Sequence, residues 1–173
     1  KMKIAYTGTQ GTGKTHAAIE RAAKLKRENP DKEVGLLINV ERECPLPINR
    51  ETTFESQMWI FTTQIREEIR LANIYDILVT DKTAMDMVAY IGAFCSGGYW
   101  KTGYSPMYMT ARRWLRTYDR IIFRTLYSNE YCMDDGIRCV DESARKSVEE
   151  ALIRLYNTCL GPMDPSDDKF TVQ

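Results

Sequence analysis

Histidines and paired cysteines are scarce in this sequence. Only His16 is a histidine among 173 residues, and the five cysteines include no Cys-x-x-Cys pair. A single histidine excludes most histidine-based metal sites, and cysteines without close partners argue against a structural zinc site. An odd number of cysteines is also unusual for a disulfide framework, so we expect free thiols in a reducing, cytoplasmic compartment.

Long apolar runs and an excess of one charge are missing too. No apolar stretch approaches the ~18 residues that a membrane span requires, and no secretory signal precedes the first glycine-rich segment, so we expect no membrane partner. Lysine plus arginine equals aspartate plus glutamate at 24 each. No overall positive field therefore indicates a nucleic-acid partner, although local patches stay open. Without linkers, repeats or low-complexity tracts, residues 1–173 are expected to form one domain.

Short apolar, β-prone runs alternate with segments of helical periodicity. The runs lie at residues 3–7, 33–40, 74–80 and 120–126, and the tail KFTVQ is a candidate fifth strand. Spacing and caps predict helices at 15–29, after Thr52, from Thr83 to about Phe94, at 108–117 and after Asp141. Strands that alternate with helices predict an α/β fold in which helices cover both faces of a parallel sheet.

Two helices have recognisable start signals. Thr52-x-x-Glu55 and Thr83-x-x-Asp86 both have the spacing of a capping box. After the first, apolar residues recur at helical spacing and predict the buried face: Phe54, Met58, Phe61, Ile65 and Ile69.

The first predicted strand runs directly into a phosphate-binding pattern. The pattern consists of Gly8, Thr9, Gln10, Gly11, Thr12, Gly13, Lys14 and Thr15. Glycines let backbone N–H groups turn inward toward an anion, and the helix that follows points its positive end at the same place. Lys14 adds a charge for the β- and γ-phosphates of ATP, and the Thr15 hydroxyl is placed to reach Mg²⁺.

A phosphate loop of this kind needs a carboxylate at the end of a neighbouring strand to hold the metal. Asp81 follows the run IYDILVT and is the best candidate. The alternative role for Asp81 is to cap the next helix. Because Thr83 can supply that cap, we favour the metal role.

The spacing of the loop narrows the class of protein. No Asn/Thr-Lys-x-Asp stretch for reading guanine is present, and the chain is short for a motor ATPase with its additional helical domain. The form Gly-x-x-Gly-x-Gly-Lys-Thr is seen in nucleoside and nucleotide kinases.

Four segments carry a resemblance to a family. They are GTQGTGKT, VERECPLPIN with the TTFESQMWIFTTQI that follows it, DKTAMDMVAY, and DDGIR with the downstream Arg145. In this order they resemble the small P-loop kinases related to the nicotinamide riboside kinase domain, including bacterial and phage members. Deoxynucleoside and thymidylate kinases look like more distant relatives. The resemblance implies a P-loop NTPase three-layer sandwich with a five-stranded parallel sheet, and the cofactors ATP and Mg²⁺.

The resemblance also implies an acceptor side. Glu41 stands where related kinases present a carboxylate to the acceptor hydroxyl, and it would take the proton as the hydroxyl attacks. A solvated charge is the alternative for Glu41, and Asp81 stays open as the base. Arg42 would bind acceptor-side phosphate or form an ion pair with Glu41. Gln57, on the helix that lines the acceptor pocket, could read a nucleobase edge, although exposed helical glutamines are common.

The pair after the third strand departs from the family. Relatives usually have Asp-Arg there, whereas this chain has Asp81-Lys82. Lysine keeps the charge but loses the planar two-pronged grip on phosphate oxygens. Asp86 is a further candidate for orienting the acceptor, with the capping box as its alternative role.

Residues 127–140 occupy the position of a lid. An arginine that arrives when a lid closes can stabilise the charge on the transferring phosphoryl group. Arg138 is the first choice for this role and Arg145 the second. Arg145 could instead pair with Glu149 one helical turn later.

The leading hypothesis is therefore an ATP-dependent kinase of a nucleoside, nucleotide or related small molecule. An alternative is a phage-type kinase of a hydroxymethylated base in DNA, because basic and aromatic residues alternate in segment 101–124: Lys101, Tyr104, Tyr108, Arg112, Arg113, Trp114, Arg116, Tyr118, Arg120 and Arg124. A non-enzymatic ATP-dependent switch is the third hypothesis. The oligomeric state stays open, with a dimer as one option.

Overall fold

The computed structural model describes residues 1–48, 51–95, 106–126, 141–161 and 169–173. Its strands are β1 (Met2–Thr7), β2 (Val34–Leu37), β3 (Ile77–Thr80), β4 (Arg120–Phe123) and β5 (Phe170–Val172). They form one sheet in the order β2-β3-β1-β4-β5, and every neighbouring pair is parallel. The predicted five-stranded parallel sheet is confirmed.

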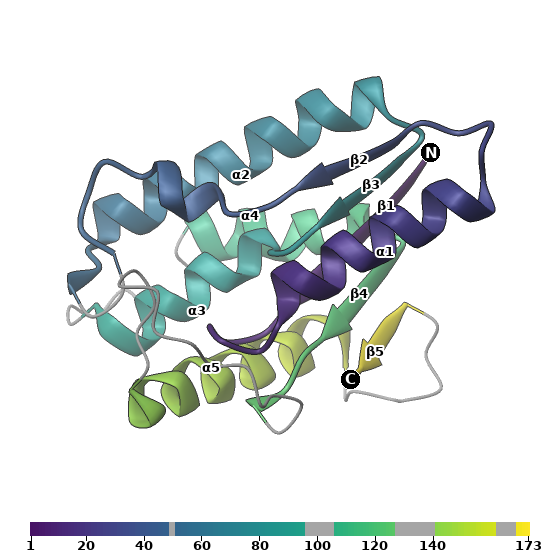
Figure 1. The fold of residues 1–173 in the computed structure, drawn as a ribbon. Helices are drawn as coiled ribbons and strands as arrows, with labels where there is room; N and C mark the ends of the chain where they lie inside the picture. Colours follow the sequence, from purple (N-terminus) through teal and green to yellow (C-terminus); the bar gives the residue numbers. More distant parts are fainter. Residues whose placement is uncertain (49–50, 96–105, 127–140, 162–168) are drawn as a thin grey trace.

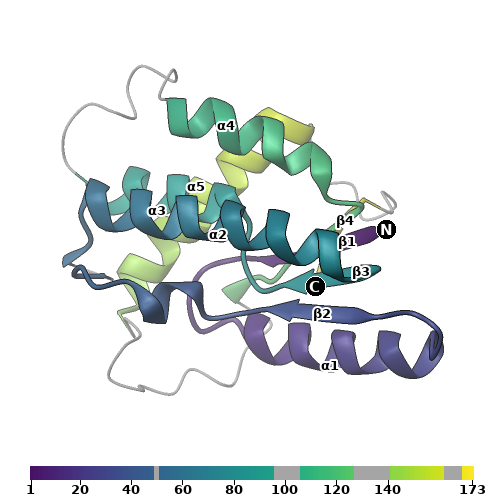
Figure 2. The same ribbon diagram turned by 90° about the horizontal axis from the view of Figure 1, so that it is seen from above.

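Helices cover both faces of this sheet, but unequally. Among the described helices, only α1 (Lys14–Glu28) lies on one face, and Figure 2 shows the others on the opposite side. These helices are α2 (Phe54–Ile74), α3 (Ala84–Phe94), α4 (Pro106–Trp114) and α5 (Glu142–Leu160). The predicted three-layer sandwich is therefore confirmed (Figure 1). No described helix is long and apolar enough to cross a membrane.

Alternation along the central strand explains the two cores. Ile4 and Tyr6 of β1 pack in the cluster beneath α1, whereas Ala5 belongs to the larger cluster beneath the other helices. A parallel strand that is buried on both faces needs apolar side chains on both sides. The carboxyl ends of the strands lie at one edge, so the segments that follow β1, β2, β3 and β4 meet there.

The segment after β2 differs from the prediction. The predicted strand at 33–40 ends at Leu37, and a 3-10 helix, η1 (Val40–Glu43), follows. Asn39 between them has φ 58°, a left-handed conformation that asparagine tolerates better than most residues. This turn of the backbone ends the strand early.

Two further predictions about α2 were wrong in register. The capping box uses Thr53 and Ser56, whose side chains each accept a hydrogen bond from the other's backbone N–H. Thr52 is buried and its hydroxyl contacts Ser56, so it does not cap the helix. Ile69 of the predicted buried face is 50% exposed, whereas Glu68 beside it is fully buried.

The predicted helix at 108–117 divides into α4 and a short 3-10 helix, η3 (Leu115–Thr117).

Candidate phosphate and acceptor site

The loop between β1 and α1 depends on three glycines in conformations that other residues rarely adopt. Gly8, Gly11 and Gly13 have φ values of 139°, 72° and 72°. At Gly8 there is also no room for a side chain, because an added Cβ would lie 2.3 Å from the carbonyl oxygen of Arg124. The strand end of β4 is therefore packed directly against the start of the loop.

The start of α1 is open to an anion. Gly13 is the N-cap residue and no side chain caps the helix. The first N–H groups of a helix have no partner within it, and together with the helix dipole they attract negative charge. The predicted loop thus has the strand before it and the helix after it that phosphate binding requires.

Lys14 lies inside the loop. It is 8% exposed, and its Nζ donates to the carbonyl oxygen of Thr9 at 2.5 Å. Burial and, next, the nearby charge of Lys82 lower the pKa of Lys14 to about 8, against the opposite effect of three carboxylates. A phosphate group beside Lys14 would restore the preference for the charged form.

Two arginines contact the outer side of the loop. Arg145 Nε donates to Gln10 O at 3.1 Å and its Nη2 donates to Gly11 O at 3.4 Å. Arg124 Nε donates to Thr12 O at 3.3 Å. The carbonyl group and the N–H group of one peptide point in opposite directions. An arginine that holds the carbonyl group therefore leaves the N–H group free to face an anion on the other side, so both contacts favour the anion-binding form of the loop.

This placement bears on the role of Arg145. The alternative partner, Glu149, accepts instead from the backbone N–H of Leu126 at 2.7 Å. Among the described contacts, the alternative pair between Arg145 and Glu149 is not formed. Arg138 and the predicted lid at 127–140 lie outside the described residues.

The two predicted metal ligands lie together. Thr15 Oγ1 donates to Asp81 Oδ2 at 2.7 Å, although the residues come from α1 and the end of β3. Asp81 is 2% exposed, and its Oδ1 has no hydrogen-bond partner among the described residues. Hydroxyl and carboxylate oxygens suit Mg²⁺, which usually keeps several other positions for water and phosphate. The residues present therefore fit a magnesium ion.

The capping question at the start of α3 is settled in favour of Thr83. Its side chain accepts from Met85 N, and Asp86 accepts from Thr83 N at 2.8 Å. Asp81 does not cap the helix. Both carboxylate oxygens of Asp86 also lie within hydrogen-bond distance of the Thr7 hydroxyl, Oδ2 at 3.0 Å and Oδ1 at 3.1 Å. Burial raises the pKa of Asp86. Asp86 thus joins β1 to α3.

Glu41 and Lys82 form an ion pair beside the loop. Lys82 Nζ lies 2.6 Å from Glu41 Oε2, and both side chains are largely buried. Burial alone would raise the pKa of Glu41, but the charge and hydrogen bond of Lys82 outweigh it and lower the pKa. Burial alone would lower the pKa of Lys82, but the negative charges of Glu41 and Asp81 outweigh burial and raise it. Both groups are therefore charged.

The structure places the two remaining acceptor-side candidates, Gln57 and Arg42, without testing their roles. Gln57 is buried at the start of α2, where its Nε2 donates to Thr52 Oγ1 at 2.6 Å. Arg42 lies in η1 with its side chain exposed. Neither placement tests the proposed contact with an acceptor.

The described residues of the basic and aromatic segment do not form one surface. Trp114 and Tyr118 turn inward and donate to Glu68. Four arginines are exposed near the amino ends of the strands, at the edge opposite the loop: Arg112, Arg113, Arg116 and Arg120. Arg124 contacts the loop instead. Lys101 and Tyr104 lie outside the described residues.

A comparison with protein families identifies the chain. A family model described as an AAA domain matches residues 3–162. The chain belongs to this family. No curated protein matches the sequence.

Solved structures similar to this AAA-domain chain are P-loop kinases. A deoxyadenosine kinase from M. mycoides with the products dCMP and dCDP bound is 16% identical, with 99% of this chain and 90% of that chain covered and a TM-score of 0.61. Thymidylate kinases from Ehrlichia chaffeensis and Candida albicans are 13% and 12% identical, with TM-scores of 0.64 and 0.62. In both cases 99% of this chain is covered, with 91% and 82% of the other chain. The predicted relationship to nucleoside and nucleotide kinases is confirmed at the level of the fold.

The structure of the AAA-domain chain adds residues that sequence reasoning missed. The backbone N–H of Asn39 donates to Asp81 Oδ2 at 3.4 Å, and the Tyr90 hydroxyl donates to Gln10 Oε1 at 2.6 Å. Asn39 lies inside the predicted strand at 33–40, and an asparagine within an apolar run is a usable signal for a left-handed turn. No local pattern marks Tyr90 or Arg124, because their partners are far away in the sequence.

Proposed function

We propose that the protein transfers a phosphoryl group from ATP to a nucleoside, a nucleotide or a related small molecule. The observation that carries the proposal is the contact between Thr15 and Asp81, beside a buried lysine and a glycine loop. The similar folds of kinases that act on deoxyadenosine and thymidylate support it. Together these features supply a place for the triphosphate and for the metal that accompanies it.

The loop would act by binding and electrostatics. Its inward N–H groups and Lys14 would hold the β- and γ-phosphates, and they would neutralise charge that builds up during transfer. Magnesium, held through Thr15 and Asp81, would supply further positive charge at the phosphates. Arg145 and Arg124 would keep the loop in its binding form.

Glu41 is the better candidate for the base. Asp81 already accepts from Thr15, so its carboxylate belongs to the metal side. Lys82 keeps Glu41 ionised, and an ionised carboxylate can accept a proton from an attacking hydroxyl. In this proposal a hydroxyl of the acceptor attacks the γ-phosphorus, its proton passes to Glu41, and ADP leaves.

A small acceptor fits better than DNA. The exposed arginines lie at the edge of the sheet opposite the loop, and Trp114 and Tyr118 are used within the core. A strand of DNA on those arginines would therefore not reach the phosphate loop by the same surface.

The test is ADP release from ATP and Mg²⁺ with a panel of acceptors. The panel contains nucleosides, nucleoside monophosphates, nicotinamide riboside and DNA with hydroxymethylated bases. We expect release to depend on at least one small acceptor and to fall on the order of 100-fold or more in Lys14→Ala. Full acceptor-dependent turnover in Lys14→Ala would overturn the mechanism, and turnover with DNA alone would overturn the acceptor class.

A further inference from the structure

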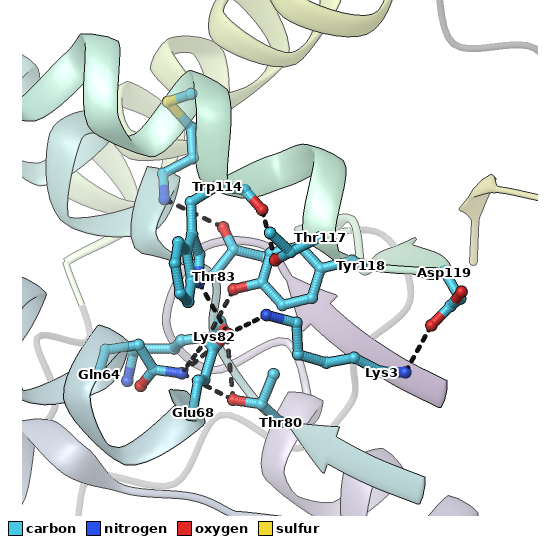
Figure 3. Close-up of polar contacts among 11 residues, drawn as sticks. Lys3, Gln64, Glu68, Thr80, Lys82, Thr83, Trp114, Thr117, Tyr118 and Asp119 are labelled. Carbon is cyan, nitrogen blue, oxygen red and sulfur yellow. Dashed lines mark hydrogen bonds and ion pairs between the residues drawn. The ribbon is translucent and has the colours of Figure 1, made fainter. Parts of the chain in front are cut away.

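A buried polar network lies between α2, the sheet and the end of α4 (Figure 3). Its centre is Glu68, which is fully buried. Glu68 Oε2 accepts from Lys3 Nζ at 2.7 Å and from Trp114 Nε1 at 2.9 Å. Glu68 Oε1 accepts from the Tyr118 hydroxyl at 2.7 Å and from Gln64 Nε2 at 2.9 Å. Four donors, from β1, α2, α4 and the segment before β4, therefore hold one carboxylate.

The charge of Glu68 is compensated within the network. Lys3 Nζ lies 4.6 Å from the ring centroid of Trp114 and 4.3 Å from that of Tyr118. A buried carboxylate is tolerated only where an opposite charge and hydrogen-bond donors replace water, and Lys3 and the two rings meet this need. Glu68 is thus a rigid anchor, and its position on α2 fixes the residue one turn before it.

That residue, Gln64, connects the anchor to the candidate site. Its Nε2 lies 2.9 Å from Glu68 Oε1, 2.8 Å from Thr80 Oγ1 and 3.2 Å from the carbonyl oxygen of Lys82. Thr80 Oγ1 donates to the same carbonyl at 3.0 Å. A reversed amide would place its oxygen against the Glu68 carboxylate and the Lys82 carbonyl, so the orientation of Gln64 is determined by its surroundings.

The other end of the same amide is unsatisfied. Gln64 is fully buried, and its Oε1 has no hydrogen-bond partner among the described residues. A buried acceptor without a donor lowers stability, so this end of the Gln64 side chain does not contribute to folding. Such groups are expected where a position serves function at the expense of stability.

We propose that Gln64, oriented by Glu68, is a positioning residue for the end of β3. The proposal rests on the proposed function, because Asp81 and Lys82, which follow this strand, have their roles in that function. Asp81 directs its carboxylate to Thr15, and Lys82 directs its ammonium to Glu41. By holding the Lys82 carbonyl, Gln64 fixes the backbone from which the metal-side carboxylate and the partner of the base both extend.

The experiment compares Gln64→Met with a matched control, Tyr118→Phe. Methionine keeps the shape and removes both polar atoms of Gln64. Phenylalanine removes one donor to Glu68 at the far end of the network and leaves the contact with Lys82 intact. Each variant is measured for its unfolding temperature, for kcat and KM, and for the Mg²⁺ dependence of binding of a non-hydrolysable ATP analogue.

Both variants should be less stable than the wild type, but only Gln64→Met should change kcat and the Mg²⁺ dependence of binding. We expect Gln64→Met to unfold at least as far below the wild type as Tyr118→Phe, because it also removes a donor to Glu68. It should in addition lose roughly 10- to 100-fold both in kcat and in the strengthening of nucleotide binding by Mg²⁺. Tyr118→Phe should unfold roughly 5 °C lower, with kcat and Mg²⁺ dependence close to the wild type. Unchanged kcat and unchanged Mg²⁺ dependence in Gln64→Met would overturn the proposal.

Two further measurements keep the test decisive. If Gln64→Met fails to fold, Thr80→Val removes the second donor to the Lys82 carbonyl and should weaken the Mg²⁺ effect in the same direction, and an unchanged Mg²⁺ effect would count against the proposal. If the wild type shows no turnover with any acceptor, the proposed function fails, but the binding measurement still tests the positioning role. The two failures are thereby distinguishable.

Discussion

The phosphate end and the acceptor end of the candidate site are built by different means. At the phosphate end, three glycines with positive φ shape the backbone, and two arginines contact its carbonyl groups. At the acceptor end, side chains from separate elements form the site in pairs, with Glu41 from η1 and Lys82 from the end of β3. Backbone shape tolerates few substitutions, whereas a pair of side chains can be changed one partner at a time.

The largest effect should separate the two carboxylates. Glu41→Gln should lower kcat on the order of 100- to 10,000-fold with ATP affinity retained, because the amide cannot take the proton. Asp81→Asn should instead weaken the binding of ATP in the presence of Mg²⁺. Steady-state kinetics and calorimetry of both variants check this. Equal loss of ATP affinity in both variants would remove the distinction between the two ends.

The second prediction concerns the backbone of the loop. Gly8→Ala should lower the free energy of unfolding by about 2–4 kcal/mol, because the added Cβ meets the Arg124 carbonyl and φ is 139°. It should also abolish nucleotide binding. Gly161→Ala is the matched control, since φ is 90° but nothing lies within 4 Å of the added Cβ. That variant should cost about 1 kcal/mol and leave binding intact, as denaturant titration and calorimetry can show.

The third prediction uses the ion pair at the acceptor end. Lys82 lowers the pKa of Glu41, so Lys82→Met should raise that pKa. Glu41 then takes up its proton at a higher pH, and the acid limb of the kcat profile should move upward in pH. Lys82→Arg keeps the charge and is the control. An acid limb at the same pH in Lys82→Met would mean that Glu41 is not the titrating base.

The smallest effect is expected in proton uptake at the phosphate end. Burial, and then Lys82, lower the pKa of Lys14 to about 8 in the free protein. Above that pH the free lysine is mostly neutral, whereas bound phosphates favour its charged form, so binding weakens as pH rises. Calorimetry in buffers of different ionisation enthalpy should find uptake of up to about one proton at pH 9 and almost none at pH 7. Equal uptake at both pH values would contradict the assigned role of Lys14.

The sequence allowed the phosphate end to be predicted because its signals are local. The glycine spacing, Lys14 and the Thr83 cap each depend on neighbouring residues, and the meeting of Thr15 with Asp81 follows from parallel strands that end at one edge. The glycine loop, the sheet and the capping of α3 are accordingly predictable from the sequence.

The acceptor end was predicted less well because its contacts are distant in sequence. The apolar periodicity of α2 favours Ile69 as a buried residue, but the buried face carries Gln64 and Glu68. Periodicity records hydrophobic residues only, and a buried charge is recognisable only when its partner, here Lys3, is placed beside it. The capping box of the same helix was shifted by one residue because Thr52 and Thr53 offer the same side chain.

The most direct test of the account is titration of the protein with a non-hydrolysable ATP analogue, with and without Mg²⁺. The account predicts binding that Mg²⁺ strengthens by at least about tenfold in the wild type, and a much smaller effect of Mg²⁺ in Asp81→Asn. Binding of equal strength with and without Mg²⁺, or no binding by the wild type, would contradict the assignment of residues 8–15 and Asp81 as a site for a metal-bound triphosphate.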